Sequence, residues 1–423
     1  MTAAQQQNPI QHSAAPRILV SHPTGNQNVR NALRSFAGRG MLAEFWTTLA
    51  WDENSRWNRW LPAGLRMELA KRSYPDLPRQ MVRMVGSHEM VRLAAGRLGL
   101  KPLLCSAERP FSIIGMYRHF DGQVARRLSK LRPDAVYAYE GGARESFREA
   151  RRLGIKTMYE LPSAFWYWEL KLLTEEAARN PEFAGLLPKL KDSPRHMQWK
   201  DEELALADLV IVPSQHVRNS LAGVVADEKI RVVSYGAPPV RPRQAGVETA
   251  GPLRVLFVGA LIQRKGIGYL LDAVEQLGSA VELTMVGSRF AANARVDAAC
   301  RRWRWLESLP QARVLDLMQQ ADVLVLPSLS EGCALVVLEA LACGLPVIVT
   351  PNTGALEFVR DGEAGFVVPI CDAAAIAARL GQLHGDRPLL AAMSANAQRV
   401  AMEKSWENYR ANLADTVRSA IWR

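Results

Sequence analysis

Short apolar segments alternate along the chain with longer stretches in which apolar residues recur every three or four positions. The short segments have the length and composition of buried strands, and the longer ones have the period of helices that cover a sheet. The strands predicted on this basis are residues 17–21, 134–140 and 156–160 in the first half and residues 255–258, 281–286, 323–327, 345–350 and 365–368 in the second half. Strands that alternate with helices predict an α/β fold with parallel sheets.

A segment rich in proline and glycine, residues 237–252, separates two such regions and is typical of a linker. In the first region, a strand is followed by a turn containing Gly25 and by a helical pattern from about Asn28, which is how a nucleotide-binding fold begins. A final amphipathic helix is predicted from the spacing of Trp406, Tyr409, Leu413 and Val417.

The composition is that of a globular protein, with 48% hydrophobic and 22% charged residues among 423. The most apolar run, residues 333–349, is interrupted by Glu339 and Pro346 and is shorter than a membrane-spanning helix requires. Residues 1–16 are polar and lack the regions of a secretory signal, so we expect a disordered tail. The cysteines are Cys105, Cys300, Cys333, Cys343 and Cys371. They form no Cys-x-x-Cys pair, which favours reduced thiols and a cytoplasmic location.

Basic residues are concentrated in the first half of the chain. Residues 1–200 contain 31 Lys and Arg against 18 Asp and Glu, whereas residues 201–423 contain 22 against 24. Such a field attracts an anionic membrane surface, a lipid-linked phosphate or nucleic acid, although solvated basic faces are also common. No known nucleic-acid-binding pattern accompanies the charge, so nucleic acid is not expected as a partner. Arg56, Arg59 and Arg66 alternate with tryptophans, which fits a peripheral position on the inner face of a membrane, an acceptor cleft or a helical insertion with a basic outer face.

Two acidic residues, Glu331 and Glu339, lie eight positions apart where a loop runs into an apolar helical segment. The order of strands and helices places both at the carboxyl edge of a parallel sheet, where ligands of such folds bind. An anion or a sugar oxygen can bind the backbone amides at the start of the helix, and carboxylates accept hydrogen bonds from sugar hydroxyls. The residues expected to supply these amides are Gly332, Cys333, Ala334 and Leu335. The pattern indicates a site for a nucleotide sugar, although two glutamates at this spacing also occur by chance.

The same segment resembles the retaining nucleotide-sugar glycosyltransferases of family 4, in which two glutamates with seven residues between them precede an Ala-x-Ala-x-Gly-x-Pro-Val sequence. The matching residues are Ala340, Ala342, Gly344, Pro346 and Val347. Residues 255–266 resemble the first strand and basic loop of that family's donor domain. Residues 207–214 resemble the last strand of its acceptor domain, and residues 230–236 resemble the strand that enters its linker. The resemblance implies the GT-B fold, with two Rossmann-like domains facing a central cleft.

The predicted organisation follows from this resemblance and from the linker. It consists of a disordered tail at residues 1–16, an acceptor-binding Rossmann-like domain at residues 17–236, the linker at residues 237–252, a nucleotide-sugar-binding Rossmann-like domain at residues 253–400, and a helix at residues 401–423 that returns to the first domain.

The resemblance also implies roles for individual residues. Lys265 is expected to bind the donor phosphates, Glu331 to face the transferred sugar, and Glu339 to bind the ribose. Gly25 lies where the family has a glycine loop close to the donor phosphates. The predicted catalytic residues are Arg264, Lys265 and Glu331.

The chain departs from the family pattern at several positions. The family's arginine after the strand glycine is replaced by Ala260, and we expect Arg264 to supply the missing charge from another point of the loop. The family's Phe-Gly pair is replaced by Cys333 and Ala334; Cys333 is interpreted as a core or lining residue rather than a nucleophile, because no histidine accompanies it. A histidine found in many relatives near the end of the strand at residues 156–160 is absent, and Glu160 is either a contact to the sugar or acceptor or a simple strand-end acid.

The leading functional prediction is a retaining, metal-independent hexosyltransferase. The donor is a nucleotide-diphosphate sugar and the acceptor is a glycan or a lipid-linked molecule of cell-surface polysaccharide synthesis. No cofactor and no metal are expected, because the chain has no Asp-x-Asp pair. Two alternatives remain at this level, a nucleotide-sugar epimerase and a non-catalytic subunit that binds a sugar nucleotide.

Overall fold

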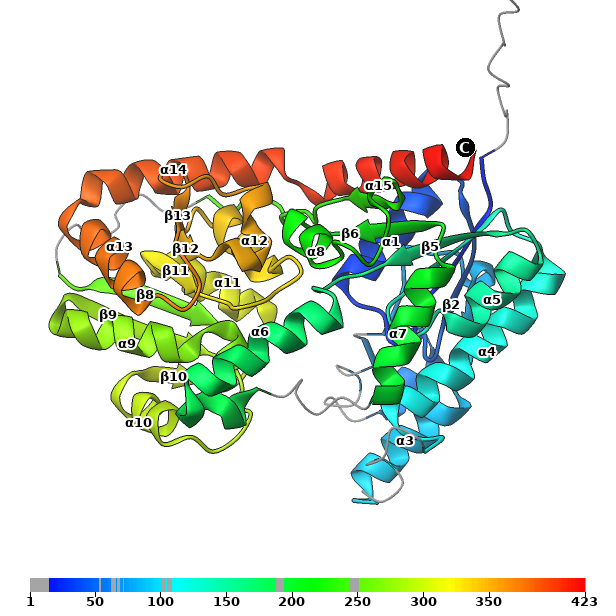
Figure 1. Cartoon of the computed structure of the whole chain (residues 1–423), viewed down its shortest axis with the longest axis horizontal. Coiled ribbons are helices and arrows are strands. Elements are labelled where there is room, and N and C mark those ends of the chain that lie inside the picture. The colour runs from blue at the N-terminus through cyan, green and yellow to red at the C-terminus, as the bar shows by residue number, and fades with distance from the viewer. Residues whose placement is uncertain are drawn as a thin grey trace, which may run out of the picture. The chain divides into compact units, whose positions relative to one another are not determined.

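The computed structural model describes residues 15–52, 55–61, 66, 69–70, 72–100, 104, 109–187, 194–242 and 251–422. The chain divides into two compact units. The first unit comprises Met1–Ala138, Gly142–Met158 and Ala414–Arg423, and the second comprises Tyr139–Gly141 and Tyr159–Leu413. Figure 1 shows the elements of both units, coloured along the chain.

The first sheet is parallel, with the strand order β3-β2-β1-β4-β5-β6-β7. Its strands are β1 (Ile18–Ser21), β2 (Leu42–Thr47), β3 (Val82–Met84), β4 (Ala135–Tyr139), β5 (Lys156–Glu160), β6 (Leu209–Val212) and β7 (Ile230–Val232). All residues of β1 and β4 are buried, because both faces of a parallel sheet are covered in such folds.

The first unit contains the α-helices α1 (Gln27–Gly38), α3 (Ser87–Arg97), α4 (Ile113–Leu131) and α5 (Arg144–Arg152), and the 3₁₀-helices η1 (Arg56–Trp60) and η2 (Arg79–Met81). The Asn26 side chain caps α1 by accepting a hydrogen bond from the Val29 amide at 2.9 Å. The start of α5 is held differently, because Asp121 of α4 accepts hydrogen bonds from the amides of Glu145 and Ser146 at 2.6 and 3.1 Å. These contacts dock α5 on α4, which lies beside it (Figure 1).

The second unit contains a six-stranded parallel sheet with the order β10-β9-β8-β11-β12-β13. Its strands are β8 (Leu253–Val258), β9 (Val281–Val286), β10 (Arg304–Leu306), β11 (Val323–Leu326), β12 (Val347–Val349) and β13 (Gly365–Val367). The order reverses direction beside β8, which is the topological switch point where ligands of such sheets bind.

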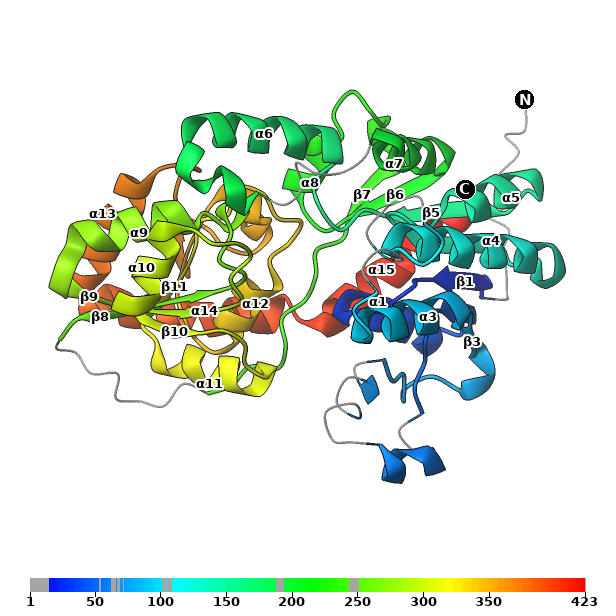
Figure 2. The same ribbon diagram turned by 90° about the horizontal axis from the view of Figure 1, so that it is seen from below.

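Helices lie on both faces of this second sheet (Figure 2).

The α-helices in or entering the second unit are α6 (Trp166–Arg179), α7 (Pro194–Leu206), α8 (Gln215–Ser220), α9 (Ile267–Leu277), α10 (Ala294–Arg302), α11 (Gln311–Gln320), α12 (Leu335–Ala342), α13 (Ala373–Gly385), α14 (Arg387–Glu403) and α15 (Trp406–Ile421). Its 3₁₀-helices are η4 (Pro181–Leu186), η6 (Asp227–Lys229), η7 (Gln263–Lys265), η8 (Gly278–Ala280), η9 (Pro351–Thr353) and η10 (Ala355–Glu357). None of the helices within the described ranges is long and apolar enough to cross a membrane.

The predicted α/β class with parallel sheets is confirmed. The strands expected at residues 156–160 and 281–286 have those bounds as β5 and β9. The hydrophobic pattern did not reveal β2 or the short β10. The residues of β10 are exposed or half-buried. The predicted domain bounds stay a prediction; residues 1–14 of the expected tail and 243–250 of the expected linker lie outside the described residues.

Candidate functional site

Three loops of the second unit follow neighbouring strands and meet at the carboxyl edge of its sheet. Residues 259–266 follow β8, residues 327–334 follow β11, and residues 350–357 follow β12. Backbone hydrogen bonds join the loops, from the Leu329 amide to the Arg264 carbonyl at 2.8 Å and from the Glu331 amide to the Asn352 carbonyl at 2.8 Å. The loops therefore form one connected structure at the place where the sequence predicts the donor site.

Gly266 allows the first two loops to approach each other. Its φ is +73°, and a Cβ atom at this position would lie 2.1 Å from the carbonyl oxygen of Pro327. Any other residue would therefore be strained in its backbone and would clash with the second loop. The conformation of residues 263–266, which contain both predicted cations, depends on this glycine.

Glu331 lies between these two cations. Its Oε1 atom is 2.7 Å from Nζ of Lys265 and 3.0 Å from a guanidinium nitrogen of Arg264, and its side chain is 13% exposed. The same Arg264 nitrogen donates to the carbonyl of Ser330 at 2.6 Å. Two cations thus surround one carboxylate, so this cluster has an excess of positive charge in a partly desolvated position.

The start of α12 lies next to this cluster in the sequence. The Ala334 amide donates to the Thr353 carbonyl at 3.0 Å and is occupied. The amides of Gly332, Cys333 and Leu335 have no acceptor among the residues that the structure describes. Unpaired amides at a helix start favour an anion or an oxygen atom of a ligand.

Glu339 lies on α12, one turn after Leu335, so its side chain leans toward the start of the helix. Its carboxylate accepts a hydrogen bond from Nε2 of Gln311 at 2.6 Å. Burial raises the pKa of Glu339, and the hydrogen bond from Gln311 opposes this shift. The group is therefore a partly desolvated acceptor near the free amides.

Cys333 and Glu160 are both buried. Burial raises the pKa of the Cys333 thiol to about 12, so the thiol is neutral near pH 7, which argues against a nucleophile. Glu160, at the end of β5, accepts a hydrogen bond from the Tyr235 hydroxyl at 2.9 Å. Its contact with a sugar or an acceptor stays a prediction.

Gly25 belongs to the first unit, at the turn after β1. Its amide donates to Nδ1 of His22 at 2.8 Å, and its φ is +65°. A Cβ atom here would lie 1.9 Å from the hydroxyl of Tyr74, so this turn requires glycine for its own packing. Its predicted place near the donor phosphates stays a prediction.

His216 was not predicted as part of the site. It lies two residues after Ser214, whose hydroxyl donates to the Gly332 carbonyl at 2.6 Å. The ring of His216 packs edge-on against Trp168, with centroids 4.8 Å apart. Burial lowers the pKa of His216 to about 4, and the charge of Glu331 acts in the opposite direction. The feature of this segment that the sequence shows is a serine, Ser214, suited to cap the start of a helix. A helix cap gives no indication of function.

The described ranges contain no group of three His, Cys, Asp or Glu side chains that could hold a metal ion. Cys105 lies outside the described residues, and the other four cysteines form no disulfide with one another.

Part of the second unit is similar to a known protein family. Residues 252–386 match the family described as glycosyl transferases group 1. The chain is 33% identical over 181 residues to a D-inositol 3-phosphate glycosyltransferase from Corynebacterium urealyticum, covering 38% of this chain and 42% of that protein. It is 31% identical over 180 residues to the amylovoran biosynthesis glycosyltransferase AmsK from Erwinia amylovora, covering 38% of this chain and 44% of that protein. The chain thus spans less than half of the length of these relatives.

A solved structure shares the fold over most of the chain. The crystal structure of Anabaena Alr3699/HepE in complex with UDP-glucose has a TM-score of 0.60 at 18% identity, covering 96% of this chain and 100% of that one. The predicted GT-B fold and the resemblance to glycosyltransferases are therefore confirmed. Residues 252–386 thus match the glycosyl transferases group 1 family, and the chain has the GT-B fold.

Proposed function

We propose that this protein is a retaining, metal-independent glycosyltransferase. It transfers a sugar from a nucleotide-diphosphate donor to a glycan or lipid-linked acceptor in cell-surface polysaccharide synthesis. The observation that carries the proposal is the cluster of Glu331, Arg264 and Lys265 beside the unpaired amides at the start of α12. Relatives named as glycosyltransferases, one of them in amylovoran biosynthesis, support the reaction class, and the UDP-glucose complex of Anabaena HepE supports a nucleotide-sugar donor.

The roles follow from charge. When the bond from the anomeric carbon to the diphosphate oxygen breaks, the diphosphate takes the electron pair and gains negative charge. The acceptor oxygen forms the new bond to the anomeric carbon, and its proton passes to the departing diphosphate. Lys265 and Arg264 stabilise that negative charge. Glu331, released from part of its pairing with the cations, accepts hydrogen bonds from the transferred sugar, and Glu339 accepts hydrogen bonds from the ribose.

A donor panel tests this function. The protein is screened by thermal shift with UDP, GDP and ADP and with their hexose conjugates, and the products of incubation with candidate acceptors are identified by mass spectrometry and anomeric NMR. Transfer with retained configuration, undiminished by a chelator, is expected. Isomerised donor would identify an epimerase, binding without turnover would identify a non-catalytic subunit, and loss of activity on chelation with rescue by magnesium would refute metal independence.

The basic first half supports a peripheral position on an anionic membrane or on a lipid-phosphate acceptor. Cosedimentation is expected with liposomes that contain acidic lipid, and salt should weaken it. Replacement of Arg56, Arg59 and Arg66 by Gln should reduce this binding and leave donor affinity unchanged; the side chain of Arg56 lies outside the described residues, and Arg59 and Arg66 are exposed. Equal cosedimentation with neutral and acidic liposomes would refute the membrane proposal.

A further inference from the structure

A helical segment that comes from the chain's first half packs on the second sheet's helices. We call α6 and η4, residues 166–186, the strap. In sequence the strap follows β5 and lies in the region expected to bind the acceptor, yet it belongs to the second unit. Figure 1 and Figure 2 both show α6 beside α9.

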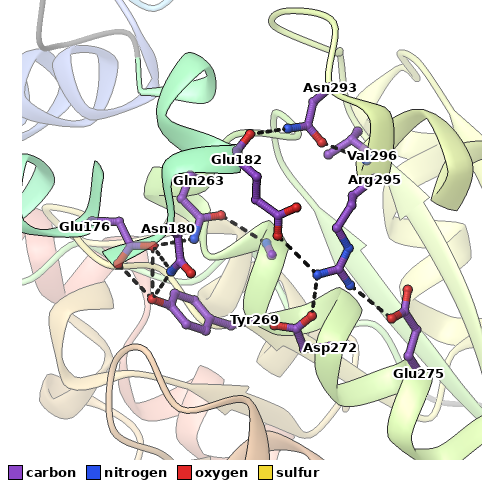
Figure 3. A network of polar contacts seen from close by, with 11 residues as sticks. Glu176, Asn180, Glu182, Gln263, Tyr269, Asp272, Glu275, Asn293, Arg295 and Val296 are labelled. Atoms are coloured by element: carbon purple, nitrogen blue, oxygen red, sulfur yellow. Dashed lines mark hydrogen bonds and ion pairs between the residues drawn. The ribbon is translucent and has the colours of Figure 1, made fainter. Parts of the chain in front are cut away.

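Glu176 of the strap is a buried carboxylate, 1% exposed. It accepts hydrogen bonds from the Tyr269 hydroxyl at 2.8 Å, from Nδ2 of Asn180 at 2.8 Å and from Nε2 of Gln263 at 2.6 Å (Figure 3). The guanidinium of Arg179 lies 3.3 Å away and is half exposed. Burial of a carboxylate raises the free energy of the folded state unless its oxygen atoms accept hydrogen bonds. Movement of any of these donors would break such a hydrogen bond, and this penalty keeps the donors in place.

Gln263 connects this carboxylate to the candidate site. It is also 1% exposed, and its Oε1 atom accepts a hydrogen bond from the Gly268 amide at 3.1 Å. Its side chain therefore spans η7, which it begins, and the start of α9. The two residues that follow Gln263 are Arg264 and Lys265.

The turn that carries the cations is consequently fixed from two sides. On one side, Glu176 holds the Gln263 amide. On the other side, the Arg264 carbonyl accepts a hydrogen bond from Leu329, and Gly266 lies against Pro327. The separation of Lys265 and Arg264 from Glu331 depends on both attachments.

We propose that Glu176 is a positioning residue for the donor diphosphate, which acts through Gln263 to fix Arg264 and Lys265. This role rests on the proposed function. It assigns to the strap a part in donor binding that no feature of the glutamate motif indicates, and it makes the affinity for the diphosphate depend on a residue that does not touch it.

The outer part of the same network offers a matched control. Glu182 of the strap is 53% exposed and lies 3.4 Å from Arg295, which also pairs with Asp272 at 2.7 Å and Glu275 at 3.0 Å (Figure 3). Because Arg295 keeps two other acidic partners, Glu182→Gln makes the same chemical change in the same segment without altering the contact to η7.

The test is an exchange of the two side chains. Gln263→Glu places a second carboxylate against Glu176, Glu176→Gln alone leaves two facing amides, and the double variant Glu176→Gln/Gln263→Glu restores an amide that donates to a carboxylate. Affinities for the tightest nucleoside diphosphate among UDP, GDP and ADP, and for its monophosphate, are measured by calorimetry at pH 8. Hydrogen–deuterium exchange of residues 264–268 is followed in the absence of nucleotide.

Gln263→Glu should weaken diphosphate binding by about tenfold, weaken monophosphate binding less, and speed amide exchange in residues 264–268. The double variant should recover most of both, and Glu182→Gln should match the parent. If the parent binds the diphosphate and Gln263→Glu binds it equally well, or if the double variant is no better than Gln263→Glu, the positioning role is refuted. If the parent binds none of the three diphosphates, the proposed function itself fails.

Discussion

The two glutamates of the motif lie in opposite electrostatic surroundings, although both are close to the same edge of the second sheet. Glu331 is paired with two cations, Lys265 at 2.7 Å and Arg264 at 3.0 Å. Glu339 accepts a hydrogen bond from the neutral amide of Gln311, and burial raises its pKa. Two glutamates of the same sequence motif can therefore have different chemical roles. The first carboxylate belongs to a charge cluster that an anionic ligand must rearrange, and the second is an acceptor suited to neutral hydroxyls.

Removal of Glu331 should separate turnover from nucleotide binding. We expect Glu331→Ala to lower kcat by about 10²–10³-fold, the scale of a lost electrostatic contact in the transition state. The affinity for a free nucleoside diphosphate should stay the same or rise, because Lys265 and Arg264 lose their competing anion. Steady-state kinetics and calorimetry measure the two effects, and equal losses of turnover and diphosphate affinity would contradict the assignment to the sugar.

Removal of the cations should instead weaken both. Lys265→Ala and Arg264→Ala are each expected to lower kcat/KM by about 10²-fold, because each stabilises the departing diphosphate. A double-mutant cycle should show a coupling energy of about 0.5–3 kcal/mol, since both side chains contact one Glu331 oxygen and are expected to share one ligand. Strictly additive effects would argue for two separate sites.

Glu339→Ala should have a smaller effect, confined to binding. We expect the affinity for the nucleotide sugar to fall by about 1–3 kcal/mol, the scale of a lost hydrogen bond to a charged group. The loss should be similar for the free nucleoside diphosphate, because the ribose is common to both ligands. A folded Glu339→Ala variant with the affinity of the parent would refute the ribose assignment and would end the contrast with Glu331.

The hydrophobic pattern predicted most of the second sheet because parallel strands that are buried on both faces are continuous apolar runs. β11 is such a run, and all four of its residues are buried. β10 could not be found in this way, because its sequence Arg-Trp-Leu lies at a sheet edge where burial is incomplete. The packing of the strap could not be predicted from the hydrophobic pattern either, because the spacing of its apolar residues does not indicate which unit it contacts.

The candidate site was predicted as a set of residues but not as a network. A resemblance to known enzymes carries the motif glutamates and Lys265, because these residues lie within one short segment each. Glu176 and Gln263 are 87 positions apart in the chain, and only the fold brings them together. The unexpected nearness of Arg264 to Glu331 has the same origin, since it depends on the close approach of two loops at Gly266.

The smallest predicted effect concerns stability, and it tests whether Glu339 is as poorly compensated as its surroundings indicate. A carboxyl whose pKa is raised in the folded state binds its proton more tightly there than in the unfolded chain, so folding stability falls as the pH rises from the ordinary Glu pKa of about 4.3 through the raised value. Glu339→Gln keeps the shape of the side chain and an acceptor for Gln311 but removes this loss. The free energy of unfolding of the variant, measured with urea, should therefore exceed that of the parent at pH 7.5, and the gain should shrink toward pH 4. The same variant should bind the nucleotide less well, because a neutral amide accepts hydrogen bonds from hydroxyls more weakly than a carboxylate does. A gain in stability that is equal at both pH values would show that the charge of Glu339 is not its cause, and the difference between the two motif glutamates would then lie only in the cations beside Glu331.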